Sequence, residues 1–237
     1  LPRLSAPPVV AAIPDKREIR IAEPAACGHY AGRVIRGLNP AARTPDWMAR
    51  RLERAGLRPK SPLVDITNYV MLECGQPLHA FDLARVRGGR IVVRRARPGE
   101  RFEAINHKTY ELAPTMAVIA DAEGPSGIAG IMGGQASEIT EKTTRVVLEA
   151  ACFERGGIQR ASKALGLRTD GSNRWEKGVS PHLAPLAAVR AAELIVAWSG
   201  ATMLGEPQDV VADLPAPQPV VLRKARPAEV LGMDVPD

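Results

Sequence analysis

Glu149 is a carboxylate inside an apolar segment, VVLEAACF at Val146 to Phe153. A carboxylate in such surroundings could bind a ligand. Carboxylates are almost never fully buried without a partner, because removing their charge from water is costly. One interpretation is that Glu149 points outward into water from an alternating strand. The other is that it points inward and accepts a charge-assisted hydrogen bond from a bound hydroxyl group.

His79 and Thr67 are two further side chains that could take part in a site. His79 follows a predicted helix within GQPLHAFD, at Gly75 to Asp82. It is either a surface or structural histidine, or a group that positions a substrate and could act as a general base. Thr67 lies earlier, on the helix itself, where a threonine ordinarily bonds back to a backbone carbonyl.

Three glycines, Gly130, Gly133 and Gly134, punctuate the segment GIAGIMGG. Such runs most often mark a turn that needs positive φ, and their second use is the close approach of backbone to a ligand. The segment has neither the GK[ST] ending nor the GxGxxG spacing of a phosphate loop. It is therefore not expected to bind a nucleotide phosphate in that way.

The segment RTDGSNRWEKGVS, residues 168–180, is dense in polar and charged residues between two predicted helices. A packed core has no use for so many hydrogen-bonding groups, so the segment predicts a functional loop. Arg168, Arg174, Glu176 and Lys177 are expected to form an ion-pair network. Contact of Arg168 or Arg174 with RNA is the alternative.

These four segments resemble, in order and at closely similar spacing, the editing domain in the β subunit of bacterial phenylalanyl-tRNA synthetase. The resemblance runs from about Arg43 to Gly200. It implies an α+β fold with a mixed β-sheet flanked by helices. It also implies that the domain hydrolyses the ester of tRNA(Phe) that wrongly carries tyrosine.

The resemblance also implies an editing pocket, whose residues in this sequence would be Thr67, His79, Gly133, Glu149, Thr169 and Gly171. In such a pocket Glu149 accepts a hydrogen bond from the tyrosine hydroxyl, His79 holds the substrate near the ester, and Gly133 leaves room for the ring. A second site is needed because a pocket built for an apolar ring rejects an added hydroxyl only about 100-fold.

Three positions depart from the pattern of that family. Gly171 stands where alanine is familiar, and the loss of a methyl group is expected to loosen the slot. Trp175 and Ser180 stand where tyrosine or phenylalanine and aspartate are more usual. Because no Ser/His/Asp triad, nucleophilic cysteine or metal cluster is visible, the expected mechanism is a positioned water molecule helped by a ribose hydroxyl.

Helix and strand signals show how these residues would be positioned. Cap residues, prolines and glycines predict helices over residues 44–56, 61–75 and 180–200, with Thr44 as the first N-cap. Strands are expected over residues 90–95, 115–120, 127–132 and 145–151. Strands clustered between helices without regular βαβ alternation favour an α+β domain.

Proline-rich stretches suggest the domain boundaries. Residues 1–24 are expected to be a linker from a preceding domain, residues 25–212 the editing domain, and residues 213–237 a linker and the start of the next domain. In the last stretch VVLRKARPAEVLG predicts a strand and the start of a helix. The chain is thus expected to be a fragment of a longer polypeptide.

Composition limits the classes of function. The net charge of +6 suits an anionic partner such as RNA, and 45% hydrophobic residues are ample for a core. No apolar run is long enough to span a membrane, so a cytoplasmic protein is expected. Cys27, Cys74 and Cys152 form no CxxC pair and are expected to be reduced thiols that bind no metal.

The resemblance implies particular partners. These are tRNA(Phe) carrying tyrosine and a synthetase α subunit, in a heterotetramer of two α and two β subunits, with neither DNA nor a membrane. No cofactor is expected in this chain, since ATP and magnesium would serve the complete synthetase. The alternatives are a non-catalytic scaffold or amino-acid-binding module of the same fold, and a stand-alone deacylase.

Overall fold

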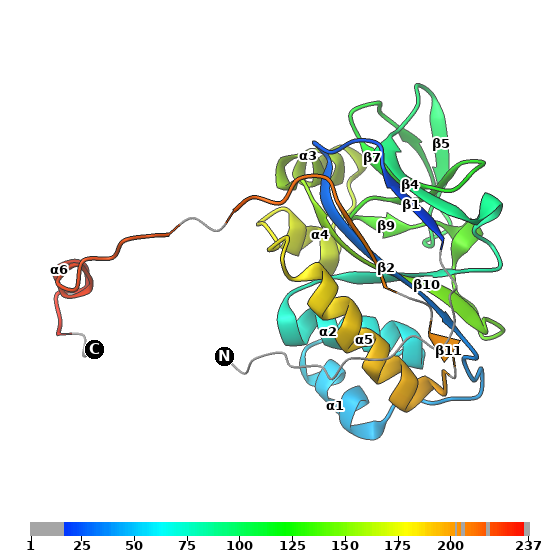
Figure 1. Ribbon diagram of the computed structural model, residues 1–237, viewed down its shortest axis with the longest axis horizontal. Coiled ribbons are helices and arrows are strands. Elements are labelled where there is room, and N and C mark those ends of the chain that lie inside the picture. The colour runs from blue at the N-terminus through cyan, green and yellow to red at the C-terminus, as the bar shows by residue number, and fades with distance from the viewer. Residues whose placement is uncertain (1–16, 202, 205–206, 217–218, 235–237) are drawn as a thin grey trace.

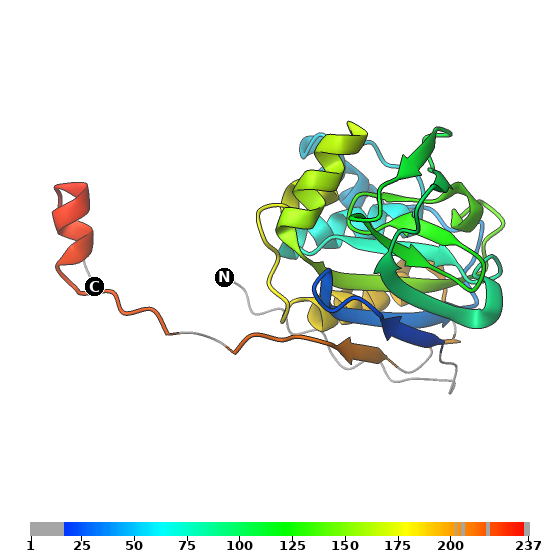
Figure 2. The ribbon, with the colours of Figure 1, turned by 90° about the horizontal axis from the view of Figure 1, so that it is seen from above.

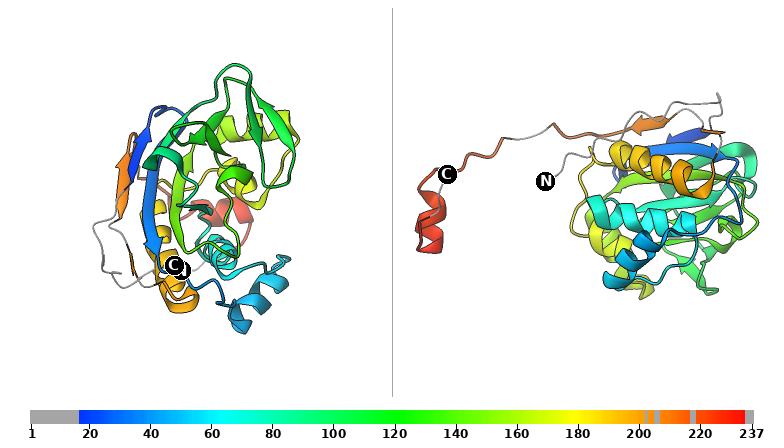
Figure 3. Two further views of the ribbon diagram at one scale, coloured as in Figure 1. Left: turned by 90° about the vertical axis from the view of Figure 1, so that its right-hand side faces the viewer. Right: turned by 90° about the horizontal axis from the view of Figure 1, so that it is seen from below.

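The computed structural model describes residues 17–201, 203–204, 207–216 and 219–234 (Figure 1). Helices lie against one face of a β-sheet, and a second sheet packs against its other face (Figure 3). This arrangement confirms the expected α+β class and contains the expected mixed sheet. Among the helices in the described residues, none is long and apolar enough to cross a membrane.

The first sheet is antiparallel and is built around one long strand, β10 (Arg145–Phe153). β10 pairs along one side with β2 (Cys27–Arg36) and along the other with β3 (Leu78–Asp82). The far side of β2 pairs with two short strands, β11 (Met203–Leu204) and β12 (Gln208–Val211). Because β10 is central, every residue near its middle has a neighbour on both sides.

The second sheet has the order β1-β4-β7-β8-β9, and only its β1–β4 pair is parallel. Its strands are β1 (Glu18–Ile21), β4 (Arg90–Arg95), β7 (Ala117–Ala120), β8 (Pro125–Ile128) and β9 (Met132–Gly133). A separate hairpin joins β5 (Glu100–Glu103) to β6 (Thr109–Leu112). Single 3-10 turns lie at η1 (Arg87–Gly89) and η2 (Gln135–Ser137).

Three helices cover the outer face of the first sheet: α1 (Asp46–Arg54), α2 (Pro62–Cys74) and α5 (Ala184–Ser199). Two others, α3 (Arg155–Leu165) and α4 (Asp170–Trp175), contribute side chains to the core between the sheets. The inner surface of α5 consists largely of alanines, which lets the helix approach the sheet closely.

The two faces of β10 are both buried, and this decides where Glu149 points. Successive strand residues point to opposite faces. Val146 and Leu148 pack with the helices, whereas Val147 and Ala151 pack in the core between the sheets. Glu149 shares the face of Val147 and Ala151, so the interpretation of a solvated, outward Glu149 is wrong.

Several predicted elements agree with the structure and others shift. The strand over residues 90–95 and the helix over 61–75 are confirmed, and the latter ends at Gly75 with φ +84°. Thr44 does not cap α1, because its hydroxyl donates to Asp65 instead. The third predicted helix begins at Ala184, after a turn that follows Ser180.

Three segments have a secondary structure that differs from the prediction. Residues 127–132 form parts of two strands, β8 and β9, joined by a tight turn at Gly130, which has φ +67°. Residues 168–180 are not wholly a loop, because α4 occupies Asp170–Trp175. Of the terminal segment 213–237, the described part contains the helix α6 (Arg226–Leu231) but no strand, unlike the prediction.

The strands nearest the two ends of the folded body lie side by side (Figures 1 and 2). The backbone N–H of Arg17, just before β1, donates to Gln208 Oε1 at 2.9 Å. The side-chain amide of Gln208, at the start of β12, donates in return to the Arg17 carbonyl. β1 thus lies within the stretch expected to be a linker, but it is paired with β4; residues 1–16 lie outside the described part.

Candidate functional site

Glu149 lies in the core between the two sheets, with only 2% of its surface exposed. Its Oε2 accepts a hydrogen bond of 2.7 Å from the hydroxyl of Tyr30, which is fully buried on β2. Its second oxygen, Oε1, accepts no hydrogen bond from any residue that the structure describes. The carboxylate is therefore held by one oxygen and keeps acceptor capacity on the other.

His79 stands directly opposite Glu149 in the pairing of β3 with β10. Directly paired residues on antiparallel strands place their side chains on the same face, within about 5 Å at Cβ. On the other side of Glu149 the paired residue is Gly32 of β2, which carries no side chain. Glu149 thus has an imidazole on one side, and on the other the side chain of Ile19 fills the space beside Gly32.

Gly133 provides the space that the His79 ring occupies. A Cβ added to Gly133 would lie 2.5 Å from His79 Cε1 and 2.7 Å from Nε2. Both distances are too short for real atoms, so no side chain fits here while the ring keeps its place. Gly133 is required for close approach and not for positive φ, which among the glycines of this turn belongs to Gly130.

The electrostatic setting of the pair makes Glu149 a proton-sensitive acceptor. Burial raises the pKa of Glu149 from 4.5 to about 7, and the hydrogen bond from Tyr30 opposes part of that rise. Burial raises the pKa of Tyr30 well above its ordinary value, with the charge of Glu149 adding to it. Tyr30 consequently remains a hydrogen-bond donor at physiological pH.

His79 is a neutral imidazole in this setting. Desolvation lowers the pKa of His79 from 6.5 to about 4. Its ring packs edge-on against Phe81 with centroids 4.5 Å apart, and its nitrogens bond to no residue in the described part of the chain. A neutral ring with both nitrogens available can donate one hydrogen bond and accept another.

Thr169 anchors α4 next to the turn that carries Gly133. Its hydroxyl donates to the Ile131 carbonyl at 3.1 Å and accepts from the Ser172 N–H at 3.1 Å, completing a capping box with Ser172. Thr169 therefore connects the start of α4 to the β8–β9 turn. Its hydroxyl thus donates one hydrogen bond and accepts one within the protein, which leaves one acceptor lone pair.

Gly171 lies against Trp175, and this contact changes the interpretation of both residues. A Cβ at Gly171 would lie 3.0 Å from Trp175 Cζ3 and 3.7 Å from the Cβ of Pro77. The indole takes up part of the space that a methyl group would need on this side of Gly171. Trp175 is fixed by its ring N–H, which donates to the Ala151 carbonyl at 3.0 Å.

Thr67 is placed differently from the other five predicted residues. Its hydroxyl donates to the Val64 carbonyl at 2.8 Å within α2, which is the ordinary helical role. His79, Gly133 and Glu149 are brought together, and Thr169 and Gly171 support them from α4. The hydrogen bond of Thr67 stays within α2 and does not connect it to His79, Gly133 or Glu149.

Tyr30 and Gly32 are residues of the site that sequence patterns did not reveal. Both lie in β2, whose sequence CGHYAGRVIR was assigned no element. The sequence offered one signal for Tyr30, which is a tyrosine in a segment that contains apolar residues. A buried tyrosine hydroxyl usually needs a hydrogen-bond partner. The partner is distant in the sequence, so only the strand pairing identifies it.

The ion pairs on the polar segment are simpler than expected. Arg168 pairs with Glu176 at 2.8 Å, and Arg174 pairs with Asp170 at 3.5 Å. Lys177 has no ion-pair partner among the described residues. The three cysteines are free thiols, and the described residues contain no cluster of His, Cys, Asp and Glu suited to a metal ion.

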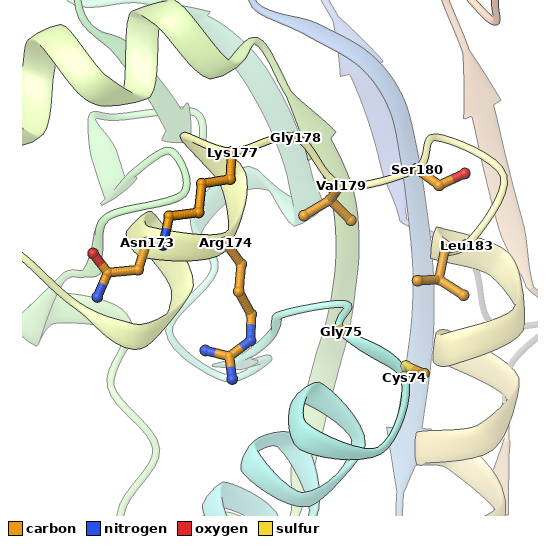
Figure 4. A pocket seen from close by; sticks show the side chains of 9 residues that line it. All are labelled: Cys74, Gly75, Asn173, Arg174, Lys177, Gly178, Val179, Ser180 and Leu183. Atoms are coloured by element: carbon orange, nitrogen blue, oxygen red, sulfur yellow. The ribbon is translucent and has the colours of Figure 1, made fainter. Parts of the chain in front are cut away.

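A cavity of about 540 Å³ lies beside α4, and we call it the α4 cavity (Figure 4). None of the six predicted pocket residues lines it. It is lined by Cys74, Gly75, Asn173, Arg174, Lys177, Gly178, Val179, Ser180 and Leu183. It therefore borders the C-terminal part of α4 and the segment that follows this helix.

Comparisons with known proteins identify similar sequences. A family model described as "B3/4 domain" matches residues 26–200. The phenylalanine–tRNA ligase β subunit of Chromobacterium violaceum is 48% identical over 226 residues, which are 95% of this chain and 28% of that protein. The β subunit of Thiobacillus denitrificans is 45% identical over 233 residues, covering 97% of this chain and 29% of that protein.

The chain thus spans less than a third of the length of the curated relatives it matches. A solved N-terminal fragment of the phenylalanyl-tRNA synthetase β subunit from Pyrococcus horikoshii aligns with 93% of this chain and 61% of that fragment. It has a TM-score of 0.49 and 12% sequence identity.

Proposed function

The chain belongs to the B3/4 domain family, and on that premise we propose that it is the editing region of a phenylalanine–tRNA ligase β subunit. Its reaction is the hydrolysis of tyrosine from tRNA(Phe). The similarity to named β subunits over nearly the whole chain supports the protein class. The site geometry supports the specific reaction.

The observation that carries the proposal is the free oxygen of a buried carboxylate. Glu149 Oε1 has no partner among the described residues, while Oε2 is held by Tyr30. A buried acceptor of this kind favours a ligand that brings a hydroxyl group, because a charge-assisted hydrogen bond contributes about 1.5 to 3 kcal/mol. Phenylalanine would leave the same oxygen desolvated and unpaired.

His79 has the role of a positioning group in this proposal. Its neutral ring lies opposite Glu149, so the imidazole can bond to the amino acid or its ester while the carboxylate binds the phenol. In the reaction, water adds to the ester carbonyl, and the bond from that carbon to the ribose oxygen breaks. The ribose oxygen takes the proton that water loses, and tyrosine and tRNA leave.

Water positioned by the pocket, with help from a neighbouring ribose hydroxyl, is the mechanism we propose. That reaction needs no cofactor; ATP and magnesium would serve aminoacylation in the complete synthetase. We also propose a cytoplasmic location and assembly with an α subunit into a tetramer of two α and two β subunits.

The proposal is tested with the chain and its Glu149→Gln variant, which keeps the size of the side chain and removes its charge. Calorimetry should show that the parent chain binds tyrosine about tenfold more tightly than phenylalanine, and that Glu149→Gln loses this preference. Tyrosyl-tRNA(Phe) should be hydrolysed by the parent chain, or by the full ligase that contains it.

Each outcome separates the candidate functions. Selective tyrosine binding without any hydrolysis in the full ligase would favour the alternative of a non-catalytic amino-acid-binding module. Equal affinity for tyrosine and phenylalanine would remove Glu149 as the residue that recognises the hydroxyl.

A further inference from the structure

The α4 cavity has the chemistry of an anion site with an apolar wall. Arg174 and Lys177 supply two cations, and its lining contains no aspartate or glutamate. In Figure 4 the guanidinium of Arg174 points from α4 toward the segment that carries Gly75. Val179 and Leu183 lie across from α4 and provide aliphatic surface.

The carboxylates near the lining residues in the sequence already have cationic partners. Glu73, next to the lining residue Cys74, bonds to Arg190 at 2.8 Å. Glu176 pairs with Arg168 at 2.8 Å. Asp170 engages Arg174 only at 3.5 Å. Lys177 is exposed and without an ion-pair partner among the residues described, so its charge is available to a ligand.

The α4 cavity is joined to the candidate site by two short pieces of chain. Arg174 and Lys177 follow Gly171 within one to two turns of the same helical segment. Gly75 at the end of α2 is separated from His79 by three residues. The cavity and the candidate site therefore take their residues from the same two short stretches of chain, 75–79 and 171–177.

We propose that the α4 cavity binds one nucleotide of single-stranded RNA close to its 3′ end, with the phosphate at Arg174 and Lys177. The base packs on the aliphatic surface of Val179 and Leu183. The inference rests on the proposed function for the identity of the RNA, because the ester held at the candidate site is attached to an RNA 3′ end.

The size of the cavity favours a nucleotide over a protein partner. A cavity of about 540 Å³ falls in the range of small-ligand sites, about 300 to 1,000 Å³. A protein interface needs about 800 Å² from each partner, which a single concave site does not supply. No aromatic ring lines the cavity, so the phosphate contacts are expected to provide most of the affinity.

The test compares two double variants of the chain. Arg174→Ala with Lys177→Ala removes the cations of the cavity. Arg160→Ala with Lys163→Ala is the matched control, because it removes an arginine and a lysine at the same spacing on α3. Arg160 is also ion-paired to a carboxylate, Glu154, at 3.6 Å.

The measured quantity is the affinity for a short single-stranded RNA with the sequence of a tRNA 3′ end, at several salt concentrations. Because the proposal places one phosphate at Arg174 and Lys177, the cavity variant should lower the slope of log affinity against log salt by about 0.7. If the two lines meet at 1 M salt, this corresponds to about fivefold weaker binding at 0.1 M. The α3 control should keep most of the affinity and slope.

Two results would overturn the inference. One is equal affinity and slope in the two double variants, and the other is displacement of the RNA by a polyglutamate peptide of equal charge. If the parent prefers tyrosine and the cavity variant still binds RNA normally, this inference fails and the proposed function stands. If RNA binding depends on the cavity but tyrosine is not preferred, the proposed function fails.

Discussion

The hydroxyl of Tyr30 donates to Glu149 across two paired strands and fixes which carboxylate oxygen is left for a ligand. The bond joins two residues that are 119 positions apart in the sequence. It also stabilises the charged form of Glu149, which burial alone would disfavour. In the proposed function, recognition of a ligand hydroxyl by Glu149 would therefore depend on a second hydroxyl supplied by the protein.

Tyr30→Phe should raise the pKa of Glu149 further, because it removes the one interaction that lowers it. The buried carboxylate would also lose its partner, at a cost of about 1 to 3 kcal/mol in the free energy of unfolding. Tyrosine binding should weaken, and its loss at acidic pH should begin at a higher pH than in the parent. Urea unfolding and calorimetry across pH measure these effects.

Tyr110→Phe is the matched control for this substitution. The Tyr110 hydroxyl accepts a hydrogen bond from Asn106 at an exposed position of the β5–β6 hairpin. Its removal should leave both the unfolding free energy and the pH dependence of tyrosine binding nearly unchanged. An equal effect of the two substitutions would contradict a special role for Tyr30.

Glu149 and His79 should have opposite effects on how the free energy of unfolding changes with pH. The folded pKa of Glu149 is raised, so its stabilising contribution is present below pH 4.5 and is lost as the pH rises through about 7. The folded pKa of His79 is lowered, so its effect has the opposite sign, and stability rises with pH between about 4 and 6.5. In the parent chain the two trends nearly cancel between about pH 4.5 and 6.5.

Glu149→Gln should unmask the His79 trend. Relative to the parent, the variant should gain stability steadily as the pH rises from about 4.5 to 7, by about 3 kcal/mol in total at 1.36 kcal/mol per unit. Chemical denaturation of both chains at matched pH values gives this difference. A difference that stays constant across the range would show that Glu149 titrates in the folded protein as it does in water.

Gly133→Ala should displace the His79 ring, because the new Cβ would lie 2.5 Å from its Cε1. We expect weaker tyrosine binding and slower hydrolysis, with the folded state largely retained. Gly127→Ala is the control: Gly127 is paired with Gly133, but its Cβ would meet other atoms only at 3.6 Å or more. NMR of the histidine ring, followed in both variants, reports the displacement directly.

Gly171→Ala alone should lower the free energy of unfolding, and it should lower it less when Trp175 is replaced by the smaller phenylalanine. Its Cβ would contact Trp175 at 3.0 Å, and Trp175→Phe would shorten the side chain that occupies this space. Trp175→Phe alone also loses the hydrogen bond to Ala151. A double-mutant cycle on unfolding free energies should show coupling of about 0.5 to 3 kcal/mol, and strict additivity would argue against the packing explanation.

Local signals predicted α2 well, but could not decide the direction of Glu149. Ser61, Pro62 and Gly75 mark the bounds of α2 through short-range geometry. Alternation along β10 could not assign a face, because the sequence does not show that both faces of this strand are covered. That information lies in the distant segments that form the helices and the second sheet.

The same limit explains why α4 was predicted as a loop. Its sequence, DGSNRW, is short and rich in residues that favour turns over helices. Its helical form depends on the Thr169 capping box and on the burial of Trp175 against Phe153, at 5.1 Å between ring centroids. Tertiary contacts of this kind override local propensity and are not visible in the segment itself.

The hydrogen bonds between Arg17 and Gln208 join the first and last strands of the folded body without a covalent link. A short peptide across β1 and β12 could join these ends, and the exposed turn at Asn106 and His107 could be cut instead. Every strand pairing would survive such a circular permutation, since termini that lie close together at a surface tolerate it. A domain with this layout can be inserted into a larger protein as one unit, entering and leaving its host at nearly the same point.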